Sequence, residues 1–292
     1  MPRVGVVGVG TMGMLAVQLL LEKGQAVVVS DVNPAALERV RLLGAQPVDA
    51  LAQVAEQAEI ILLFVPGPAQ VEAVVAGDGG LLSAGRTGQT IVDLSTIDPQ
   101  TTRRLGRQAA DLGVDYLDAP ILGRPAAVGR WVLPVGGEAE VLERCRPVLE
   151  KLAREVIHVG PLGAGHTLKL LNALMFSAIN AMTAEMMAIS HKAGLEPKVL
   201  YETITASEAA TVSGLFRECG RKIVERDFDP AFTIDLLCKD NGLAIQMAKE
   251  VGAPPLLAGA IQTINELAKA TGHGREDTSA LVKVYEQLLE VR

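Results

Sequence analysis

The sequence predicts an α/β protein in which an N-terminal doubly wound parallel sheet is followed by an all-helical C-terminal domain. Up to the glycine-rich stretch 160–165, short apolar runs alternate with segments of helical periodicity. Such alternation is typical of βαβ units, because parallel strands need crossover connections. Beyond that stretch only helical periodicity recurs. We therefore expect two domains, residues 1–162 and 163–292.

The predicted strands are short and rich in Val, Ile and Leu. The first begins at Arg3 and ends in glycines, and the second ends at Asp31. Pro66–Pro68 closes the third. We expect strands at 3–8, 26–30, 59–65, 90–94, 114–118, 131–135 and 156–159. Helices are expected at 12–23, from Asn33 onward, and at 98–112 and 138–152.

The helical domain begins with one long segment, 167–193, which is rich in Leu, Met and Ala and ends at Gly194. It is apolar on much of its circumference, which indicates burial against other helices and against a second subunit. We therefore expect a homodimer or homotetramer. Further helices are expected at 197–206, 211–226, 234–251, 255–271 and 276–291.

Composition excludes several classes of partner. The net charge is −7 without a basic patch, so neither nucleic acid nor an anionic membrane surface is expected. No run of about 18 uninterrupted apolar residues occurs, so no membrane span is expected.

The cysteines and histidines form no motif typical of disulfides, redox activity or metal binding. Cys145, Cys219 and Cys238 form no CxxC pair and are odd in number, which indicates buried free thiols and a cytoplasmic protein. The four histidines, of which His166 is one, form no HxH or HxxxH cluster, so no metal site is expected.

A glycine-rich turn follows the first predicted strand and opens the first helix. It reads Gly8-Val9-Gly10-Thr11-Met12-Gly13. In this context GxGxxG predicts a dinucleotide site of the Rossmann type. The first glycine permits the turn, the second lets backbone approach a pyrophosphate, and the third lets helix and strand pack closely.

Asp31, at the end of the second predicted strand, bears on the choice of cofactor. A carboxylate there can accept hydrogen bonds from ribose hydroxyls and would repel the 2′-phosphate of NADP. The next arginine, Arg39, lies further along the following helix. The sequence thus favours NAD over NADP, unless Asp31 only caps that helix.

Two lysines on predicted helices are candidates for catalysis. Lys169 and Asn172 are three residues apart and share one helix face. A lysine on an apolar helix is costly to bury unless it is paired or deprotonated, which suits proton transfer. A surface position with an extended side chain is the alternative for Lys169. Lys239 is either a second candidate or one half of a solvated pair with Asp240.

Polar side chains follow two predicted strands, at the edge where open α/β sheets bind ligands. They lie in Asp93-Leu-Ser95-Thr96 and in Asp118-Ala-Pro-Ile-Leu122-Gly123-Arg124-Pro125. Plain turns would have a similar composition.

Taken together, these motifs resemble the β-hydroxyacid dehydrogenase family, which includes 3-hydroxyisobutyrate dehydrogenase and tartronate semialdehyde reductase. The resemblance spans nearly the whole chain. It is carried by Gly8–Gly13, by Val65-Pro66 with Gln70, by Ser95-Thr96, by Asp118–Arg124, by Gly163-x-Gly-x-x-x-Lys169-x-x-Asn172 and by Lys239-Asp240.

The resemblance implies an enzyme that moves a hydride between NAD(P) and a small 3-hydroxy acid or its semialdehyde. Lys169 would be the general acid/base, Asn172 would orient substrate and Lys239 would lie by the nicotinamide. The resemblance also implies a cofactor set, namely Gly8, Gly10, Thr11, Met12, Gly13, Asp31, Val65, Pro66, Gln70, Thr96 and Lys239. Its substrate set is Ser95, Leu122, Gly123, Arg124, Lys169 and Asn172.

The sequence departs from the family pattern in the loop after Asp118. Leu122 stands where the family usually has Ser, and Arg124 where it usually has Gly. An arginine there would pair with a carboxylate of the substrate, recognise a second anionic group, or point to solvent. Two other interpretations remain open: a non-catalytic dinucleotide-binding protein on the same fold, and an imine reductase.

Overall fold

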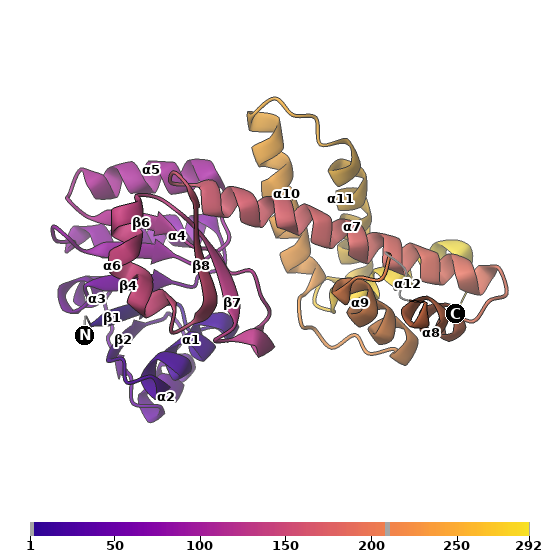
Figure 1. Ribbon diagram of the computed structural model, residues 1–292, viewed down its shortest axis with the longest axis horizontal. Helices are drawn as coiled ribbons and strands as arrows, with labels where there is room; N and C mark the ends of the chain where they lie inside the picture. The colour runs from indigo at the N-terminus through magenta and orange to yellow at the C-terminus, as the bar shows by residue number, and fades with distance from the viewer. Residues whose placement is uncertain (1–2, 208–210, 292) are drawn as a thin grey trace. The chain divides into compact units, whose positions relative to one another are not determined.

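The computed structural model describes residues 3–207 and 211–291, so the outermost ends of the predicted domains lie outside it. The chain forms two compact units, Met1–Lys169 and Leu170–Arg292 (Figure 1). The division falls within helix α7 (Ala164–Lys192), later than the predicted boundary at residue 162. The first turns of α7 bond to the sheet unit, as described below, and therefore belong to it.

The N-terminal unit is built on one eight-stranded sheet in the order β3-β2-β1-β4-β5-β6-β7-β8. Neighbouring strands are parallel except β6 and β7, where Asp118 pairs with Gly136 in antiparallel orientation. The predicted doubly wound sheet is confirmed. The strands are β1 Val4–Val7, β2 Val27–Ser30, β3 Gln46–Pro47, β4 Ile60–Leu63, β5 Thr90–Asp93, β6 Asp115–Asp118, β7 Trp131–Gly136 and β8 Ala153–Gly160.

Two features of the sheet escaped the sequence patterns. The connection from β6 to β7 carries only a 3-10 turn, η2 (Pro125–Ala127), so the chain turns back antiparallel and makes no crossover. The edge strand β3 is two residues long and contains Pro47, so it has no periodicity to detect.

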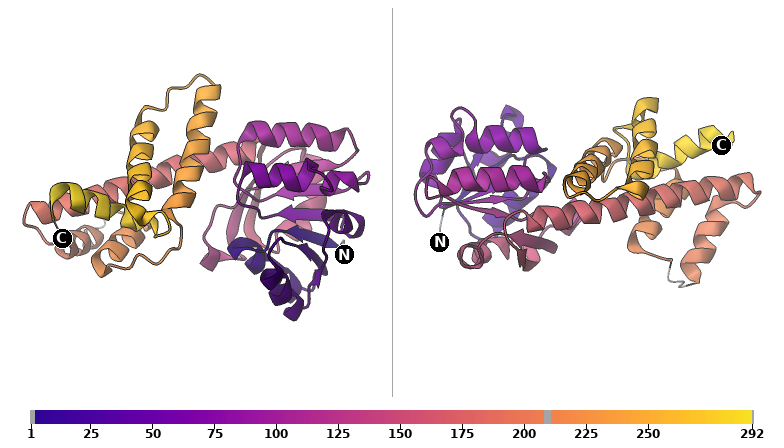
Figure 2. Two further views of the ribbon diagram at one scale, coloured as in Figure 1. Left: turned by 180° about the vertical axis from the view of Figure 1, so that it is seen from behind. Right: turned by 90° about the horizontal axis from the view of Figure 1, so that it is seen from above.

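Helices cover both faces of this sheet (Figures 1 and 2). Alternate residues of β1 enter different cores: Val4 and Val6 join one cluster, and Val7 joins the other. The first core includes residues of α1 (Thr11–Glu22), α2 (Pro34–Leu42) and α6 (Ala139–Leu149). The second includes residues of α3 (Leu51–Gln57), α4 (Pro68–Ala76) and α5 (Pro99–Ala110), with the 3-10 turn η1 (Leu81–Ser83).

In the described part of the C-terminal unit all regular elements are helical, as predicted. Figure 1 shows α10 and α11 side by side. The predicted helix 276–291 is a 3-10 turn followed by a shorter helix, and 255–271 ends in a π-helical turn with Gly272 at φ 96°. The elements after α7 are α8 Pro197–Ala206, α9 Gly214–Glu225, α10 Ile234–Glu250, α11 Leu256–Ala268, η3 Lys269–His273, η4 Thr278–Ala280 and α12 Leu281–Leu289.

Among the described residues, α7 alone is long and apolar enough to cross a membrane by length and composition. Its most apolar window has a mean hydropathy of 1.3, and half of that window is buried inside the protein. The core helix of a globular domain has the same properties. One side of α7 is indeed buried, including Ala184 and Met187, whereas Met182 and Ile189 are exposed.

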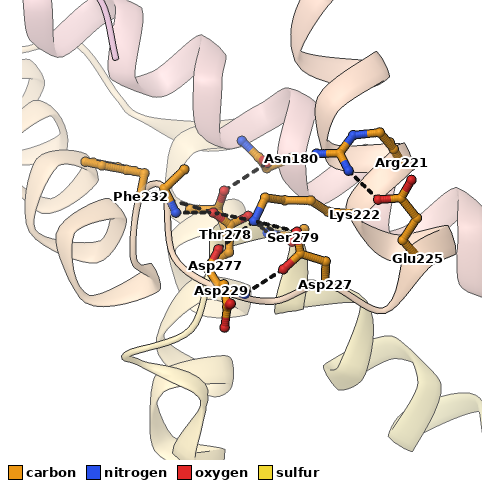
Figure 3. A network of polar contacts seen from close by, with 11 residues as sticks. Asn180, Arg221, Lys222, Glu225, Asp227, Asp229, Phe232, Asp277, Thr278 and Ser279 are labelled. Carbon is orange, nitrogen blue, oxygen red and sulfur yellow. Dashed lines mark hydrogen bonds and ion pairs between the residues drawn. The ribbon is translucent and has the colours of Figure 1, made fainter. Parts of the chain in front are cut away.

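A buried ionic network ties the C-terminal unit together (Figure 3). The Lys222 ammonium on α9 donates to the carbonyl oxygen of Asp229 at 2.5 Å and lies 3.7 Å from the Asp277 carboxylate. Asp277 also accepts hydrogen bonds from the backbone N–H groups of Ala231 and Ser279. One lysine and one aspartate thus join α9, the segment before α10 and the start of η4.

Candidate active site

The glycine turn between β1 and α1 has the geometry that a pyrophosphate needs. Gly8 has φ +89°, a conformation that favours glycine. A Cβ on Gly13 would lie 2.0 Å from the Gly8 oxygen, so the helix packs directly on the turn. A Cβ on Gly10 would meet nothing within 4 Å, and Gly10 and Thr11 are exposed.

The start of α1 is therefore open to an anion. Gly10 is the N-cap residue, no side chain caps it, and no acidic residue lies in the first turn. The first N–H groups of a helix and its dipole favour negative charge. The residues present thus fit the pyrophosphate of a dinucleotide, with Met12 half-buried on the first turn.

Asp31 is held against this turn. One of its carboxylate oxygens accepts from the backbone N–H of Val9 at 2.6 Å, and the other from that of Asn33 at 2.7 Å. The cap of α2 is Asn33, whose side chain accepts from the N–H of Ala35. Asp31 is thus not the N-cap residue, and its carboxylate lies beside the glycine turn.

The segments after β4 and β5 are joined through Ser95. Its buried hydroxyl accepts from the backbone N–H of Val65 at 3.1 Å. Its own N–H donates to Asp93 at 2.9 Å. Thr96 is half-buried, whereas Pro66 and Gln70 are exposed. Both segments follow parallel strands and so lie at the same edge of the sheet.

The loop after β6 is fixed by its backbone. Leu122 forms an antiparallel bridge with Val132, with hydrogen bonds in both directions. The indole N–H of Trp131 donates to the carbonyl oxygen of Arg124 at 3.0 Å. A Cβ on Gly123 would lie 2.5 Å from the Trp131 ring, so the loop packs closely on that side chain. The Arg124 side chain is half-buried.

Lys169 reaches the same loop from α7. Its ammonium donates to the carbonyl oxygen of Ile121 at 2.8 Å, and the residue is half-buried. The ammonium is therefore held by a backbone carbonyl oxygen, and the side chain does not simply extend into solvent. Asn172, one turn later on α7, is exposed and belongs to the other compact unit.

Lys239 also lies in the C-terminal unit, on α10. Its ammonium is 2.8 Å from the Asp240 carboxylate. The pair is not fully solvated, because Asp240 is buried and Lys239 is only partly exposed. The proximity of Lys239 to a cofactor stays a prediction.

The sequence did not predict that Asp118 and His166, both buried, meet one turn before Lys169. The Asp118 carboxylate accepts from the backbone N–H groups of Gly163 and His166, each at 2.7 Å. Burial raises the pKa of the Asp118 carboxyl above its ordinary value, although His166 and the two N–H donors act against this. One signal was available: the stretch 160–165 offers no Ser, Thr, Asp or Asn to cap the helix that follows.

No metal site accompanies these groups. Within residues 3–207 and 211–291, no three His, Cys, Asp or Glu side chains gather in a way that could hold a metal ion. The three cysteines are free and buried, as the sequence predicts.

Comparison with known protein families matches both units. Residues 3–160 match the NAD-binding domain of 6-phosphogluconate dehydrogenase. Residues 163–285 match the NAD-binding domain of NADP-dependent 3-hydroxyisobutyrate dehydrogenase. These matches define the class as an NAD(P)-binding dehydrogenase.

Individual relatives narrow the class. The chain is 36% identical to 2-(hydroxymethyl)glutarate dehydrogenase of Eubacterium barkeri, over 99% of this chain and 96% of that protein. It is 34% identical to 2-hydroxy-3-oxopropionate reductase of Escherichia coli, over 97% of each. The protein belongs to the β-hydroxyacid dehydrogenase family and is an NAD(P)-dependent oxidoreductase of small hydroxy acids.

Solved structures agree with this assignment. Mycobacterium tuberculosis 3-hydroxyisobutyrate dehydrogenase, solved with L-serine, has a TM-score of 0.88 and 26% identity, covering 97% of this chain and 99% of that one. An imine reductase from Myxococcus stipitatus has a TM-score of 0.62 and 21% identity, covering 98% and 99%. That second likeness extends to the fold alone, so the imine reductase interpretation has no further support.

Proposed function

We propose that this enzyme reversibly oxidises the hydroxyl of a small 3-hydroxy acid to the semialdehyde, with Lys169 as general acid/base. The observation that carries the proposal is the 2.8 Å bond between the Lys169 ammonium and the Ile121 carbonyl oxygen. It holds an amine against the loop that follows β6, at the sheet edge where α/β folds bind ligands. The same edge carries Ser95 and Thr96.

In oxidation, the neutral Lys169 amine would take the proton of the substrate hydroxyl as the C–H bond breaks. In reduction, the ammonium would return that proton to the developing alkoxide. The dinucleotide, when bound, takes up or supplies the hydride. Asn172 would orient the substrate, and Arg124 would pair with a carboxylate of the substrate.

The chemistry associated with the relatives supports a 3-hydroxy acid. One relative is named for 2-(hydroxymethyl)glutarate, and another was solved with L-serine; both molecules contain a HOCH₂–CH–COO⁻ unit. We propose that the substrate contains the same unit. Ser95, Leu122, Gly123 and Arg124 would contact it.

For the cofactor, we propose NAD over NADP, bound by Gly8, Gly10, Thr11, Met12, Gly13 and Asp31. Val65, Pro66, Gln70, Thr96 and Lys239 would complete that site. We further propose a cytoplasmic enzyme, which suits three buried free thiols.

A steady-state screen of the purified chain tests the proposal. The substrates would be 3-hydroxyisobutyrate, D-glycerate, L-serine, 4-hydroxybutyrate, dihydroxypropanesulfonate and 2-(hydroxymethyl)glutarate, each with NAD and with NADP. We expect turnover of at least one acid that contains HOCH₂–CH–COO⁻. Turnover of none of them, nor of the matching aldehydes, would contradict the proposal.

Removal of the Asp31 carboxylate should narrow the preference for NAD. In Asp31→Ala the repulsion of a 2′-phosphate is lost, so the ratio of kcat/KM with NAD to that with NADP should fall. Asn33→Ala is the matched control, because it removes the true cap of α2 and leaves Asp31 in place. An unchanged ratio in Asp31→Ala would leave this residue a purely structural role.

We also propose that the exposed apolar face of α7 forms a subunit interface. Met182 and Ile189 lie on this face with 60% and 51% of their surface exposed, at a spacing that keeps them on one side of the helix. Multi-angle light scattering should show a dimer or tetramer that Met182→Lys with Ile189→Lys converts to a smaller species. Leu42→Lys, at an exposed leucine on α2, should leave the mass unchanged. A monomeric parent protein would refute the interface.

A further inference from the structure

The first turn of α7 is capped by a side chain distant in sequence. Gly163 precedes the helix, and neither it nor its neighbours can supply a side-chain acceptor. We infer that Asp118, with His166 and Thr102, fixes the start of α7. The Lys169 amine is thereby kept at its position against the loop that follows β6, residues 119–130, which we propose binds the substrate. These three are positioning residues, and the inference rests on the role proposed above for Lys169.

Asp118 is completely buried at the end of β6. Its two oxygens accept separately from the N–H groups of Gly163 and His166, at 2.7 Å each. Each oxygen thus meets one of the N–H groups that a helix start leaves without intrahelical partners. An amide in its place could accept only one of these bonds and would turn an NH₂ group toward the other donor.

His166 connects the same turn to two more elements. Its Nε2 is 3.2 Å from the carbonyl oxygen of Ser95, which can only accept, so Nε2 carries a hydrogen. Its Nδ1 shares a hydrogen bond of 2.7 Å with the hydroxyl of Thr102 on α5, which also contacts the carbonyl oxygen of Asp98 at 3.1 Å. The ring is completely buried. The start of α7 is thereby bound to the ends of β5 and β6 and to α5.

Two glycines let the helix approach this closely. A Cβ on Gly165 would lie 2.5 Å from the Pro134 oxygen and 2.7 Å from the Asp118 oxygen. A Cβ on Gly136 would lie 2.4 Å from the Asp118 carboxylate and 2.9 Å from the N atom of Ala164. Neither position leaves room for a larger side chain, so the close packing fixes the position of the start of α7 on the sheet.

The position of the start of α7 also determines where the Lys169 amine lies. This residue follows His166 by one turn and donates to Ile121, three residues after Asp118. The segment 118–121 and the segment 163–169 are therefore joined at two points. A shift of the helix start would carry the amine with it, and a misplacement of about 1 Å at a reacting group can cost about 100-fold in rate.

Asp118→Asn in the full chain tests the inference. We expect kcat to fall about 10- to 100-fold while the Kd for the dinucleotide stays within about twofold. The primary deuterium isotope effect, measured with substrate deuterated at the hydroxyl carbon, should rise, because hydride transfer becomes slower relative to product release. A purely structural role would lower the melting temperature and leave kcat of the folded enzyme and its isotope effect unchanged. That result would overturn the inference.

Two further variants keep the test decisive. If Asp118→Asn fails to fold, Thr102→Val removes the bond to His166, together with a bond to the Asp98 carbonyl oxygen within α5, and leaves Asp118 in place. It should lower kcat about 3- to 10-fold, the scale of one hydrogen bond. An unchanged kcat in Thr102→Val would then overturn the inference. The matched control is Gln89→Leu, since the buried Gln89 side chain likewise bonds backbone at a helix end, the carbonyl oxygens of Ala55 and Ala58 at α3. It should lower the melting temperature without changing kcat.

The same measurements separate this inference from the proposed function. Full activity in Lys169→Ala would refute the role of Lys169, whatever Asp118→Asn does. An inactive Lys169→Ala together with a fully active Asp118→Asn would refute the positioning device and leave the proposed function intact.

Discussion

Lys169→Ala should lower kcat by about 100-fold or more, with the Kd for the dinucleotide unchanged. General acid/base catalysis typically contributes about 100-fold or more to the rate, and the variant should lose that contribution. The structure supplies the physical reason, because the amine is held 2.8 Å from the Ile121 carbonyl oxygen and beside the predicted substrate loop. Stopped-flow and steady-state kinetics with the best substrate from the screen would measure the effect.

The chain offers a matched control on the same helix. Lys192 also lies on α7 and also donates to a backbone carbonyl oxygen, that of Leu289, at 2.8 Å. Lys192→Ala should keep kcat within about twofold, since it touches none of the proposed site. Lys169→Arg separates charge from proton transfer, because an arginine keeps the charge but does not give up its proton at ordinary pH. Turnover of Lys169→Ala at the rate of the parent would remove this residue from the mechanism.

Asp277→Ala should destabilise the C-terminal unit by about 3 kcal/mol, because the buried ammonium of Lys222 loses its buried counter-charge and keeps only the partly exposed Asp227 carboxylate, 3.6 Å away. Lys222 and Asp277 are only 6% and 4% exposed, and the ammonium lies 3.7 Å from the carboxylate. The substitution also removes the acceptor for the N–H groups of Ala231 and Ser279. Figure 3 shows Asp277 beside Lys222 and Ser279. Two costs therefore act in the same direction.

Urea unfolding should report this loss selectively. Trp131 is the one tryptophan in the sequence and lies in the N-terminal unit, so its fluorescence follows that unit. Far-ultraviolet circular dichroism follows the helices of both units, so its transition should broaden or move to lower urea. Arg221→Ala removes the neighbouring exposed pair with Glu225 and should cost at most about 1 kcal/mol. Equal losses in the two variants would contradict the assignment of the buried network.

Periodicity predicted the architecture because the elements bury regular apolar faces. β1 and β4 are buried along their whole length, and each appears in the sequence as a continuous apolar run. The roles of Gly8, Gly10 and Gly13 could be predicted because each glycine meets a different steric requirement of the same turn. β3 escaped because its pairing with β2 depends on the neighbouring strand and on no pattern of its own.

The candidate site was only partly predictable for a related reason. Lys169 stood out as a charge on an apolar helix, a local anomaly. The pairing of Asp118 with His166 did not, because these residues lie 48 positions apart along the chain and become partners only in the folded sheet. The sequence shows that the start of α7 lacks a local N-cap side chain. It does not show which residue of another element takes over that role.

The antiparallel return after β6 has a consequence for how this enzyme could acquire new substrates. The loop 119–130 is held by backbone bonds at Leu122 and Arg124 and by the buried Trp131 ring. Those bonds do not depend on which side chains stand at positions 122 and 124. Selection can therefore exchange these two side chains while the nucleotide turn and the start of α7 keep their geometry. By the role proposed above for positions 122 and 124, such an exchange would change the group that the substrate must present.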